Sequence, residues 1–169
     1  MLISLSGRSC TGKTTVARQV ARDLAAVYLH VKAIEHSMRG EGWPVDGEGY
    51  SVAHTVAEEN LRLGRIVVAD AINPWPMTRV HWRAVATRVG VRIIDVELVC
   101  SDEREHRRRV EAYLSLSADS KPPTWQQVAE ADYHPWEGDQ IVLDTARLTI
   151  DDTVAAILAN VSRPPERAS

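Results

Sequence analysis

The sequence lacks phenylalanine, contains only two cysteines and has no apolar run of 18 residues. A chain without such a run offers no candidate for a membrane-spanning helix. Two distant cysteines, Cys10 and Cys100, exclude a scaffold held by several disulfides, and we expect both to be free thiols in a reducing compartment. Because phenylalanine is missing, leucine, isoleucine and valine must form most of the core.

Basic residues are not in excess: 20 Lys and Arg stand against 23 Asp and Glu, which gives a formal charge of −3. Proteins that bind nucleic acid usually carry a basic patch or a positive net charge, so this balance argues against a nucleic-acid partner. The apolar and charged fractions, 44% and 25%, are those of an ordinary globular chain. Residues 1–6 have no basic start and are expected to form a strand rather than a signal peptide, which predicts a cytoplasmic protein.

Five short apolar runs rich in β-branched residues alternate with longer segments of helical period. Residues 40–49 and 115–123 are predicted loops, and the tail from residue 162 is predicted to be disordered. Because strands that alternate with helices form a parallel sheet with right-handed crossovers, the sequence predicts an α/β fold in a single domain, 1–169. The predicted strands are 1–6, 27–31, 65–70, 91–99 and 140–144, and the predicted helices are 13–26, 33–39, 50–63, 77–89, 102–114, 124–131 and 151–161.

Between the first predicted strand and the first predicted helix, the sequence GRSCTGKT fits the phosphate-loop pattern G-x-x-x-x-G-K-[ST] at every fixed position. Glycines let the backbone turn its N–H groups toward phosphate oxygens, Lys13 adds a positive charge, and the hydroxyl of Thr14 can bind Mg²⁺. The motif therefore predicts a bound nucleoside triphosphate, held by Gly7, Arg8, Ser9, Cys10, Thr11, Gly12, Lys13, Thr14 and Thr15.

Three further segments accompany the phosphate loop: VVAD at 67–70 followed by Asn73, CSD at 100–102 before an arginine-rich helix, and VLDT at 142–145. With these segments the chain, over about residues 1–160, resembles the small P-loop kinases related to chloramphenicol phosphotransferase, gluconate kinase, zeta-type toxins and the kinase part of polynucleotide kinase. The resemblance implies a three-layer α/β/α P-loop NTPase fold with a five-stranded parallel sheet of order 2-3-1-4-5. It also implies a helical lid at about residues 102–135, with ATP and Mg²⁺ as cofactors.

Asp70 ends a predicted buried strand, at the edge of the sheet where open α/β folds bind their ligands. The resemblance implies that Asp70 holds Mg²⁺ together with Thr14, or that it accepts the proton of the phosphoryl acceptor. The alternative is a residue that caps the turn after the strand.

Four residues are predicted to contact the acceptor. Asn73 and Arg79 follow Asp70 on the same edge, although a solvated helix position is the alternative for Arg79. Trp43 and Trp75 lie in predicted loops, away from any periodic apolar face, and are candidates to line the acceptor pocket. Exposed tryptophans are also common without a ligand.

The segment after the second predicted strand departs from the family pattern. Relatives place an aspartate there as the base toward the acceptor hydroxyl, whereas Lys32 occupies the position here. A lysine accepts a proton only when its pKa is strongly lowered, which leaves Asp70 and Glu35 as the remaining carboxylates. Lys32 and Glu35 are thus predicted catalytic residues, and Lys32 can alternatively orient an anionic acceptor. Phosphoryl transfer depends mainly on positioning and charge neutralisation, so a missing base need not abolish it.

The helix with the sequence DEREHRRRVE at 102–111 is predicted to carry the nucleotide-side cations. Pairs of Glu and Arg four residues apart stabilise such a helix, and a solvated face is the bland alternative. The resemblance implies that Arg104 and Arg109 stack on adenine or neutralise the transferring group, with Asp144 and Thr145 beside the nucleotide. Tyr113 stands where relatives often have a further arginine.

The leading hypothesis is a kinase that transfers the γ-phosphoryl group of ATP to a hydroxyl of a small molecule such as an antibiotic, sugar or metabolite. The negative total charge and the loop tryptophans favour a neutral or cationic acceptor. A nucleotide or nucleic-acid 5′-hydroxyl kinase is one alternative, and an ATP-binding regulator with impaired catalysis is another. ATP rather than GTP follows from the resemblance, since no guanine-reading N-K-x-D motif occurs.

Overall fold

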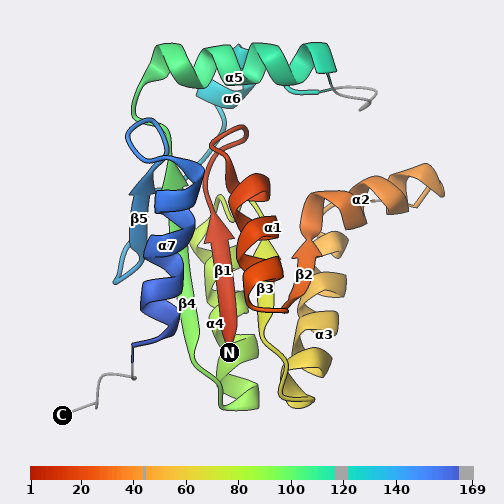
Figure 1. The fold of residues 1–169 in the computed structure, drawn as a ribbon. Coiled ribbons are helices and arrows are strands. Elements are labelled where there is room, and N and C mark those ends of the chain that lie inside the picture. Colours follow the sequence, from red (N-terminus) through yellow and green to blue (C-terminus); the bar gives the residue numbers. More distant parts are fainter. Residues whose placement is uncertain (44, 117–121, 164–169) are drawn as a thin grey trace.

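The computed structural model of the chain describes residues 1–43, 45–116 and 122–163 (Figure 1). Within this part, no helix combines the length and the apolar character needed to cross a membrane. The strands are β1 Leu2–Ser6, β2 Val27–His30, β3 Val67–Asp70, β4 Ile93–Val99 and β5 Ile141–Asp144. The helices are α1 Lys13–Asp23, α2 Val31–Gly40, α3 Glu48–Arg62, α4 Pro76–Val89, α5 Glu103–Leu116, α6 Trp125–Ala129 and α7 Ile150–Val161.

The five strands form one parallel sheet in the order β2-β3-β1-β4-β5, which confirms the predicted topology. The register places Asp70 at the end of β3 between Leu5 of β1 and His30 at the end of β2. Because parallel strands present their carboxyl ends at the same edge, the residues that follow β1, β2 and β3 meet there.

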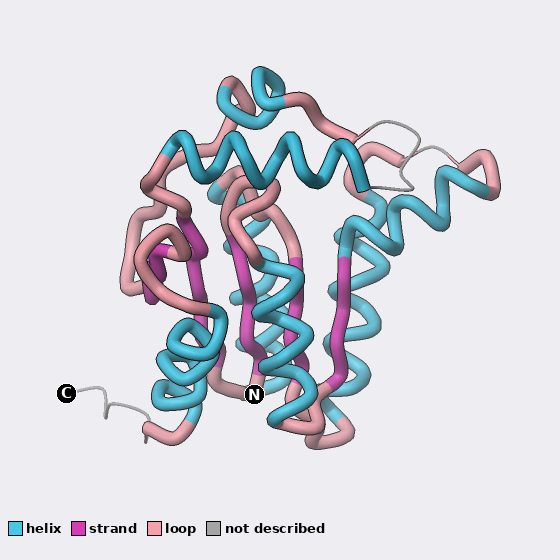
Figure 2. The backbone as a smooth tube through the Cα atoms, turned by 45° about the horizontal axis from the view of Figure 1, so that its top comes forward, coloured by secondary structure: helices cyan, strands magenta, loops and turns pink. Residues whose placement is uncertain are grey.

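Helices cover both faces of the sheet, as the sequence predicts. On one face α1 and α7 pack against side chains such as Ile3, Val96 and Leu98, and on the other α3 and α4 pack against side chains such as Leu2 and Val67. Alternate residues of each strand point to opposite faces, so a strand buried on both sides reads as a continuous apolar run. Figure 2 shows α5 and α6 lying across the carboxyl ends of the strands.

Several element boundaries differ from the predictions for local reasons. The helix expected at 13–26 ends at Asp23, because Ala25 adopts a left-handed φ of 48° that reverses the chain into β2. Helix α2 starts directly after β2, and the loop expected at 40–49 is shortened by α2 and by α3, which begins after Gly47 at φ 104°. Most of the loop expected at 115–123 and of the disordered tail, at 117–121 and 164–169, lies outside the described residues.

Asn73 connects the segment after β3 to residues of β1 by hydrogen bonds. Its side-chain amide donates to Ser6 Oγ at 2.9 Å, to the Leu5 carbonyl oxygen at 3.3 Å and to Ser4 Oγ at 3.4 Å, while its oxygen accepts from Trp82 Nε1 at 3.1 Å. The residue is 0% exposed. The side chain is committed to the fold, because a buried amide must satisfy its polar atoms internally, and this argues against the predicted acceptor contact through Asn73.

We expect Asn73→Ala to lower the free energy of unfolding by about 2–4 kcal/mol, because the substitution leaves the buried N–H of Trp82 without its acceptor. Urea unfolding followed by tryptophan fluorescence measures the change. Asn60→Ala, which removes an exposed side-chain bond to Val56, is the matched control and should change stability by less than about 0.5 kcal/mol. Equal effects of the two substitutions would contradict the role of Asn73.

A second polar group that packs against the core is the half-buried imidazole of His54 on α3, which lies edge-on to Trp82 with ring centroids 4.3 Å apart. Burial lowers its pKa to about 4 from an ordinary 6.5, and the nearby His81 and Arg88 act in the same direction. The folded protein therefore keeps this ring neutral where the unfolded chain would protonate it.

Because the folded pKa is the lower one, the stabilising contribution is complete above pH 6.5 and is lost as the pH falls from 6.5 toward 4. We expect the protein to lose more stability between pH 7.5 and pH 5 than the variant His54→Gln, which does not titrate there. Thermal melts of both proteins across this range provide the comparison. Parallel melting curves would show that His54 does not couple folding to pH.

Candidate active site

The phosphate loop joins β1 to α1 and is shaped by three left-handed residues. Gly7, Cys10 and Gly12 have φ values of 135°, 63° and 93°. A Cβ atom at Gly7 would lie 2.2 Å from the carbonyl oxygen of Leu98, so this position admits no side chain. The left-handed turns place the loop around the N-terminus of α1, as the motif predicts.

The N-terminus of α1 is suited to an anion. Its cap residue, Gly12, makes no side-chain hydrogen bond, so the first N–H groups of the helix have no capping side chain. Beside them Lys13 is 7% exposed, and its ammonium donates to the carbonyl oxygen of Arg8 at 2.7 Å. Burial lowers the pKa of Lys13 to about 8, and the nearby Asp70 opposes this shift. A buried cation beside uncapped N–H groups is what a polyphosphate requires.

Asp70 and Thr14, predicted as a metal-binding pair, are in direct contact. The hydroxyl of Thr14 donates to Asp70 Oδ2 at 2.7 Å, and the same oxygen accepts from the Tyr28 hydroxyl at 2.9 Å. Asp70 is 1% exposed, and its charge, together with burial, raises the pKa of Tyr28. A hydroxyl and a carboxylate at the mouth of a phosphate loop are oxygen ligands of the kind that Mg²⁺ prefers. Together with the loop they offer the oxygen and N–H groups that an ATP·Mg²⁺ complex would require.

Two residues of β2, Tyr28 and His30, belong to this cluster although the sequence reasoning missed them. His30 Nε2 lies 3.7 Å from Asp70 Oδ2, and burial lowers the pKa of the imidazole, with Asp70 acting against that shift. Both residues lie in β2, whose sequence pattern alone predicts a buried apolar strand. The available signal was their position beside Asp70 once the sheet order is known.

On the nucleotide side, Arg109 of α5 is held against the turn after β5. Its guanidinium donates to the carbonyl oxygen and to Oγ1 of Thr145, both at 2.9 Å, and to Glu105 at 2.8 Å. Thr145 Oγ1 in turn donates to the carbonyl oxygen of Thr11 in the phosphate loop at 2.9 Å. The structure thus brings Arg109 and Thr145 to the loop, as expected for nucleotide-side residues.

The other two predicted nucleotide-side residues lie differently. Asp144 accepts from the N–H groups of Ser101 and Ala146, both at 3.0 Å, and so closes the turn after β5. Arg104 is exposed on α5. Both remain predictions for nucleotide contact, and neither side chain joins the cluster around Lys13.

The lid helices are tied to the phosphate loop by two contacts that the sequence did not suggest. The Arg8 guanidinium donates to the carbonyl oxygens of Val128 and Ala129 at the end of α6, both at 2.8 Å. His106 of α5, which is 6% exposed, lies with Nε2 2.7 Å from the Ser9 carbonyl oxygen. Helices α5 and α6 are therefore joined to the main chain of the phosphate loop by hydrogen bonds.

On the acceptor side, Lys32 of α2 meets Tyr113 of α5. The ammonium donates to the Tyr113 hydroxyl at 3.0 Å and lies 5.0 Å from the ring centroid. The two positions that depart from the family pattern are therefore neighbours in space. Glu35, one turn further along α2, pairs with Arg39 at 3.5 Å, and its Cγ atom occupies the space where a side chain at Gly49 would lie.

Arg79 is buried and bonded to main-chain oxygens, which argues against the predicted contact with an acceptor. The residue is 4% exposed, and its guanidinium donates to the carbonyl oxygens of His134 at 2.6 Å and Pro135 at 2.8 Å. It also lies 4.4 Å from the ring centroid of Trp136. Arg79 is a buried cation satisfied by main-chain oxygens, so its role is to hold the segment after α6 against α4.

The two loop tryptophans remain candidates of different kinds. Trp43 is 62% exposed after α2. Trp75 caps α4 and donates from Nε1 to Asp132 at 2.9 Å, with about half of its surface exposed. Its partner Asp132 lies on the side of the molecule that carries the phosphate loop.

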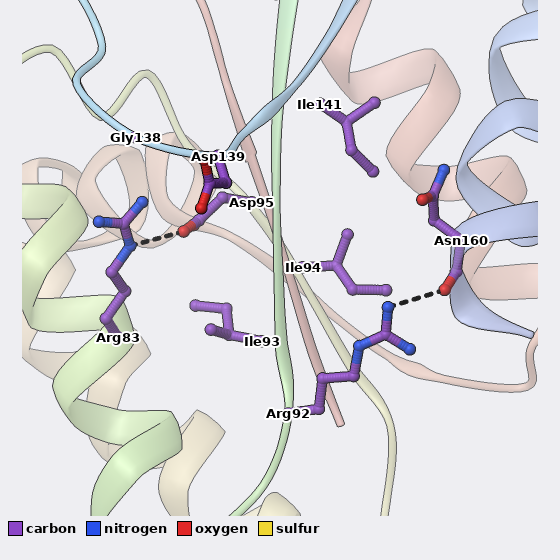
Figure 3. Close-up of a pocket in the computed structure, with 9 residues that line it drawn as sticks. All are labelled: Arg83, Arg92, Ile93, Ile94, Asp95, Gly138, Asp139, Ile141 and Asn160. Carbon is purple, nitrogen blue, oxygen red and sulfur yellow. Dashed lines mark hydrogen bonds and ion pairs between the residues drawn. The ribbon is translucent and has the colours of Figure 1, made fainter. Parts of the chain in front are cut away.

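A small cavity of about 180 Å³ opens beside the phosphate loop between Arg8, Ser9, Pro74 and the lid residues Val128 and Tyr133. A larger one of about 380 Å³ lies at the other end of the sheet, where β4 has no β5 partner before Val96 (Figure 3). There Arg83 pairs with Asp95 at 2.7 Å. The larger cavity contains none of the phosphate-binding residues, so the loop rather than cavity size marks the active site.

Comparison with known proteins identifies the family of the chain. A model of the AAA_33 family, described as an AAA domain, matches residues 2–131. A cytidylate kinase from Pyrobaculum calidifontis is 27% identical over an alignment of 181 positions. The alignment covers 91% of this chain and 89% of that protein.

Solved structures share the fold at low identity. The APS kinase CysC of Mycobacterium tuberculosis, in complex with AMPPNP and APS, superposes with a TM-score of 0.76 at 20% identity, covering 96% of this chain and 97% of that chain. A gluconokinase from Sinorhizobium meliloti has a TM-score of 0.66 at 18% identity, covering 95% of this chain and 91% of that chain. Because the family model spans most of the chain and the phosphate loop lies within it, the chain belongs to the AAA_33 family of P-loop kinases.

Proposed function

We propose that this kinase transfers the γ-phosphoryl group of ATP to a hydroxyl of a small molecule, with Mg²⁺ bound at Thr14 and Asp70. The observation that carries the proposal is the contact between these two residues at 2.7 Å, beside the buried ammonium of Lys13. A phosphate cradle with an oxygen pair for the metal at its mouth supports phosphoryl transfer by positioning and charge neutralisation.

When bound, ATP would supply the phosphoryl group, and Mg²⁺ would neutralise part of the negative charge on its phosphate oxygens. Lys13 and the N–H groups of the loop hold the phosphates. On the nucleotide side, the hydrogen bonds from Arg109 to Thr145 hold α5 against the turn after β5. In the transfer, the acceptor oxygen forms a bond to the γ-phosphorus while the bond from that phosphorus to the bridging oxygen of ADP breaks. The proton of the acceptor hydroxyl must then move to a carboxylate or to water.

We assign that proton to Glu35 rather than to Asp70. Asp70 Oδ2 is already engaged by Thr14 and Tyr28, and its charge serves the metal. Glu35 packs against Gly49, the residue before Tyr50, and the Tyr50 hydroxyl accepts from the N–H of Asn73, three residues after Asp70. Glu35 is also partly exposed, so a substrate can reach it.

A nucleotide is the second candidate acceptor, favoured by the similarity to a cytidylate kinase. In that case the bond would form to a phosphate oxygen of the acceptor rather than to a hydroxyl. A nucleotide acceptor would give a nucleoside diphosphate, whereas a hydroxyl acceptor would give a new phosphate monoester.

The first prediction concerns the phosphate site. Lys13→Ala should weaken binding of a non-hydrolysable ATP analogue, with Mg²⁺ present, by about 10- to 100-fold, because a charge-assisted contact to phosphate is lost. Isothermal titration calorimetry measures the affinity. Arg22→Gln removes an exposed positive charge at the far end of α1 and serves as the control, with no expected change. Unaltered affinity of Lys13→Ala would contradict the site.

The second prediction concerns transfer itself. With ATP and Mg²⁺, ADP should form faster when hydroxyl compounds are added, and phosphorus NMR should detect the new phosphate monoester. Glu35→Gln should lower kcat by about tenfold or more with little change in the KM for ATP, because a positioned base contributes at least that factor. ATP binding without product from sugars, alcohols or nucleotides would identify a binding protein instead of a kinase of small molecules.

A further inference from the structure

The phosphate loop is attached to the lid through one of its carbonyl oxygens. The oxygen of Ser9 lies 2.7 Å from Nε2 of His106 on α5, although the two residues are 97 positions apart in sequence. A carbonyl oxygen only accepts, so Nε2 carries the hydrogen of this bond. The N–H group of the same peptide, which belongs to Cys10, has no acceptor among the described residues. This peptide of the loop thus has a carbonyl that is held and an N–H that is left open.

The planarity of the peptide bond relates these two groups. In a trans peptide the N–H points to the side opposite the carbonyl oxygen, and the described residues contain no cis peptide bond. Because His106 holds the Ser9 oxygen on the side of α5, the N–H of Cys10 points to the opposite side. It is then available, like the uncapped N–H groups at the start of α1, to bind an anion.

The backbone of Cys10 does not favour this orientation by itself. Its φ of 63° is left-handed, which is less favourable than a negative φ for a residue with a Cβ atom. Rotation of the Ser9–Cys10 peptide by half a turn would return φ of Cys10 to negative values and would turn its N–H toward the lid. A contact that holds the Ser9 oxygen from outside the loop opposes this rotation, and His106 supplies that contact.

His106 is itself held by both lid helices. The residue is 6% exposed, and its main-chain N–H donates to the carbonyl oxygen of Asp102 at 2.9 Å at the start of α5. Its ring lies edge-on to Trp125, the first residue of α6, with ring centroids 5.4 Å apart and an interplanar angle of 81°. Burial and this contact restrict the rotation of the ring, so the lid determines the direction of Nε2.

We propose that His106 is a positioning residue for ATP, which holds the Ser9 carbonyl oxygen so that the N–H of Cys10 faces the bound phosphates. A donor that is oriented before the ligand arrives binds it more tightly, because binding then requires no rearrangement of the backbone. His106 acts through the main chain of the loop. This inference rests on the proposed function only in that the loop binds ATP, and it does not depend on the acceptor.

Nucleotide affinity in the absence of an acceptor tests this role. His106→Leu removes the donor and should weaken binding of a non-hydrolysable ATP analogue with Mg²⁺ by about 3- to 10-fold in calorimetric titrations, the effect of one hydrogen bond. His106→Asn, whose amide is too short to reach the position of Nε2, should weaken binding equally. His106→Gln places an amide N–H near that position and should bind within about twofold of the original protein. The two amides keep the comparison valid if His106→Leu does not fold.

The control addresses general damage to the lid helix. Val110→Ala shortens a fully buried side chain one turn after His106 on α5. It should lower the thermal stability of the protein, because it leaves a cavity in the core, without changing nucleotide affinity.

The amide of Cys10 gives a second readout. In nitrogen-15 NMR spectra, inorganic pyrophosphate should move the Cys10 amide proton downfield in the original protein and in His106→Gln, because this N–H then donates to a charged phosphate oxygen. In His106→Leu and His106→Asn the shift should fall to about half or less.

The outcomes separate this inference from the proposed function. Unchanged nucleotide affinity in His106→Leu and His106→Asn, or the same Cys10 shift in every variant, would overturn the role of His106. A loss of affinity in Val110→Ala as large as in His106→Leu would also overturn it, because damage to α5 would then explain both. Affinity that follows the donor at position 106, without product from any acceptor, would retain the positioning role and overturn the hydroxyl kinase.

Discussion

The hydrogen bond from Thr14 to Asp70 is the contact on which the site depends, because it joins the first helix to the third strand. Asp70 reaches that position only because β3 pairs with β1, which carries the phosphate loop. The register of β1 and β3 thus determines the distance between the oxygens of Thr14 and Asp70. A buried carboxylate is costly unless it is paired, and here Thr14 and Tyr28 both donate to it. The same arrangement that stabilises Asp70 holds its carboxylate beside the phosphate loop, where we propose that Mg²⁺ binds.

Most of the architecture could be predicted from the chain. The alternation of apolar runs with helical periods gave the parallel sheet, and the phosphate loop located the edge that binds ligands. Single positions were harder to predict. Asn73 and Arg79 follow Asp70 in sequence and look like site residues, but both are buried, and their polar atoms bond to the main chain and to Trp82. Burial of a polar residue depends on what packs over it, and a local pattern does not contain that information.

Contacts between distant segments were also beyond the sequence. His106 and Ser9 are 97 residues apart, and Lys32 and Tyr113 are 81 apart, so nothing in either neighbourhood indicates a partner. The two departures at Lys32 and Tyr113 looked independent when each was judged against its own segment. In the folded chain they form one unit, with the positive charge on the acceptor side and the aromatic ring on the lid.

Gly7 lies so close to the carbonyl oxygen of Leu98 that a substitution at Gly7 affects the sheet as well as the phosphate loop. Because a methyl group at Gly7 would collide with a main-chain oxygen of the central sheet, the first glycine of the motif is constrained by packing even in the nucleotide-free protein. A variant at this position would separate β1 from β4 before it changed any bond to phosphate. Loss of nucleotide affinity in such a variant would report a damaged scaffold, and only residues whose side chains face the loop interior can isolate the chemistry of binding.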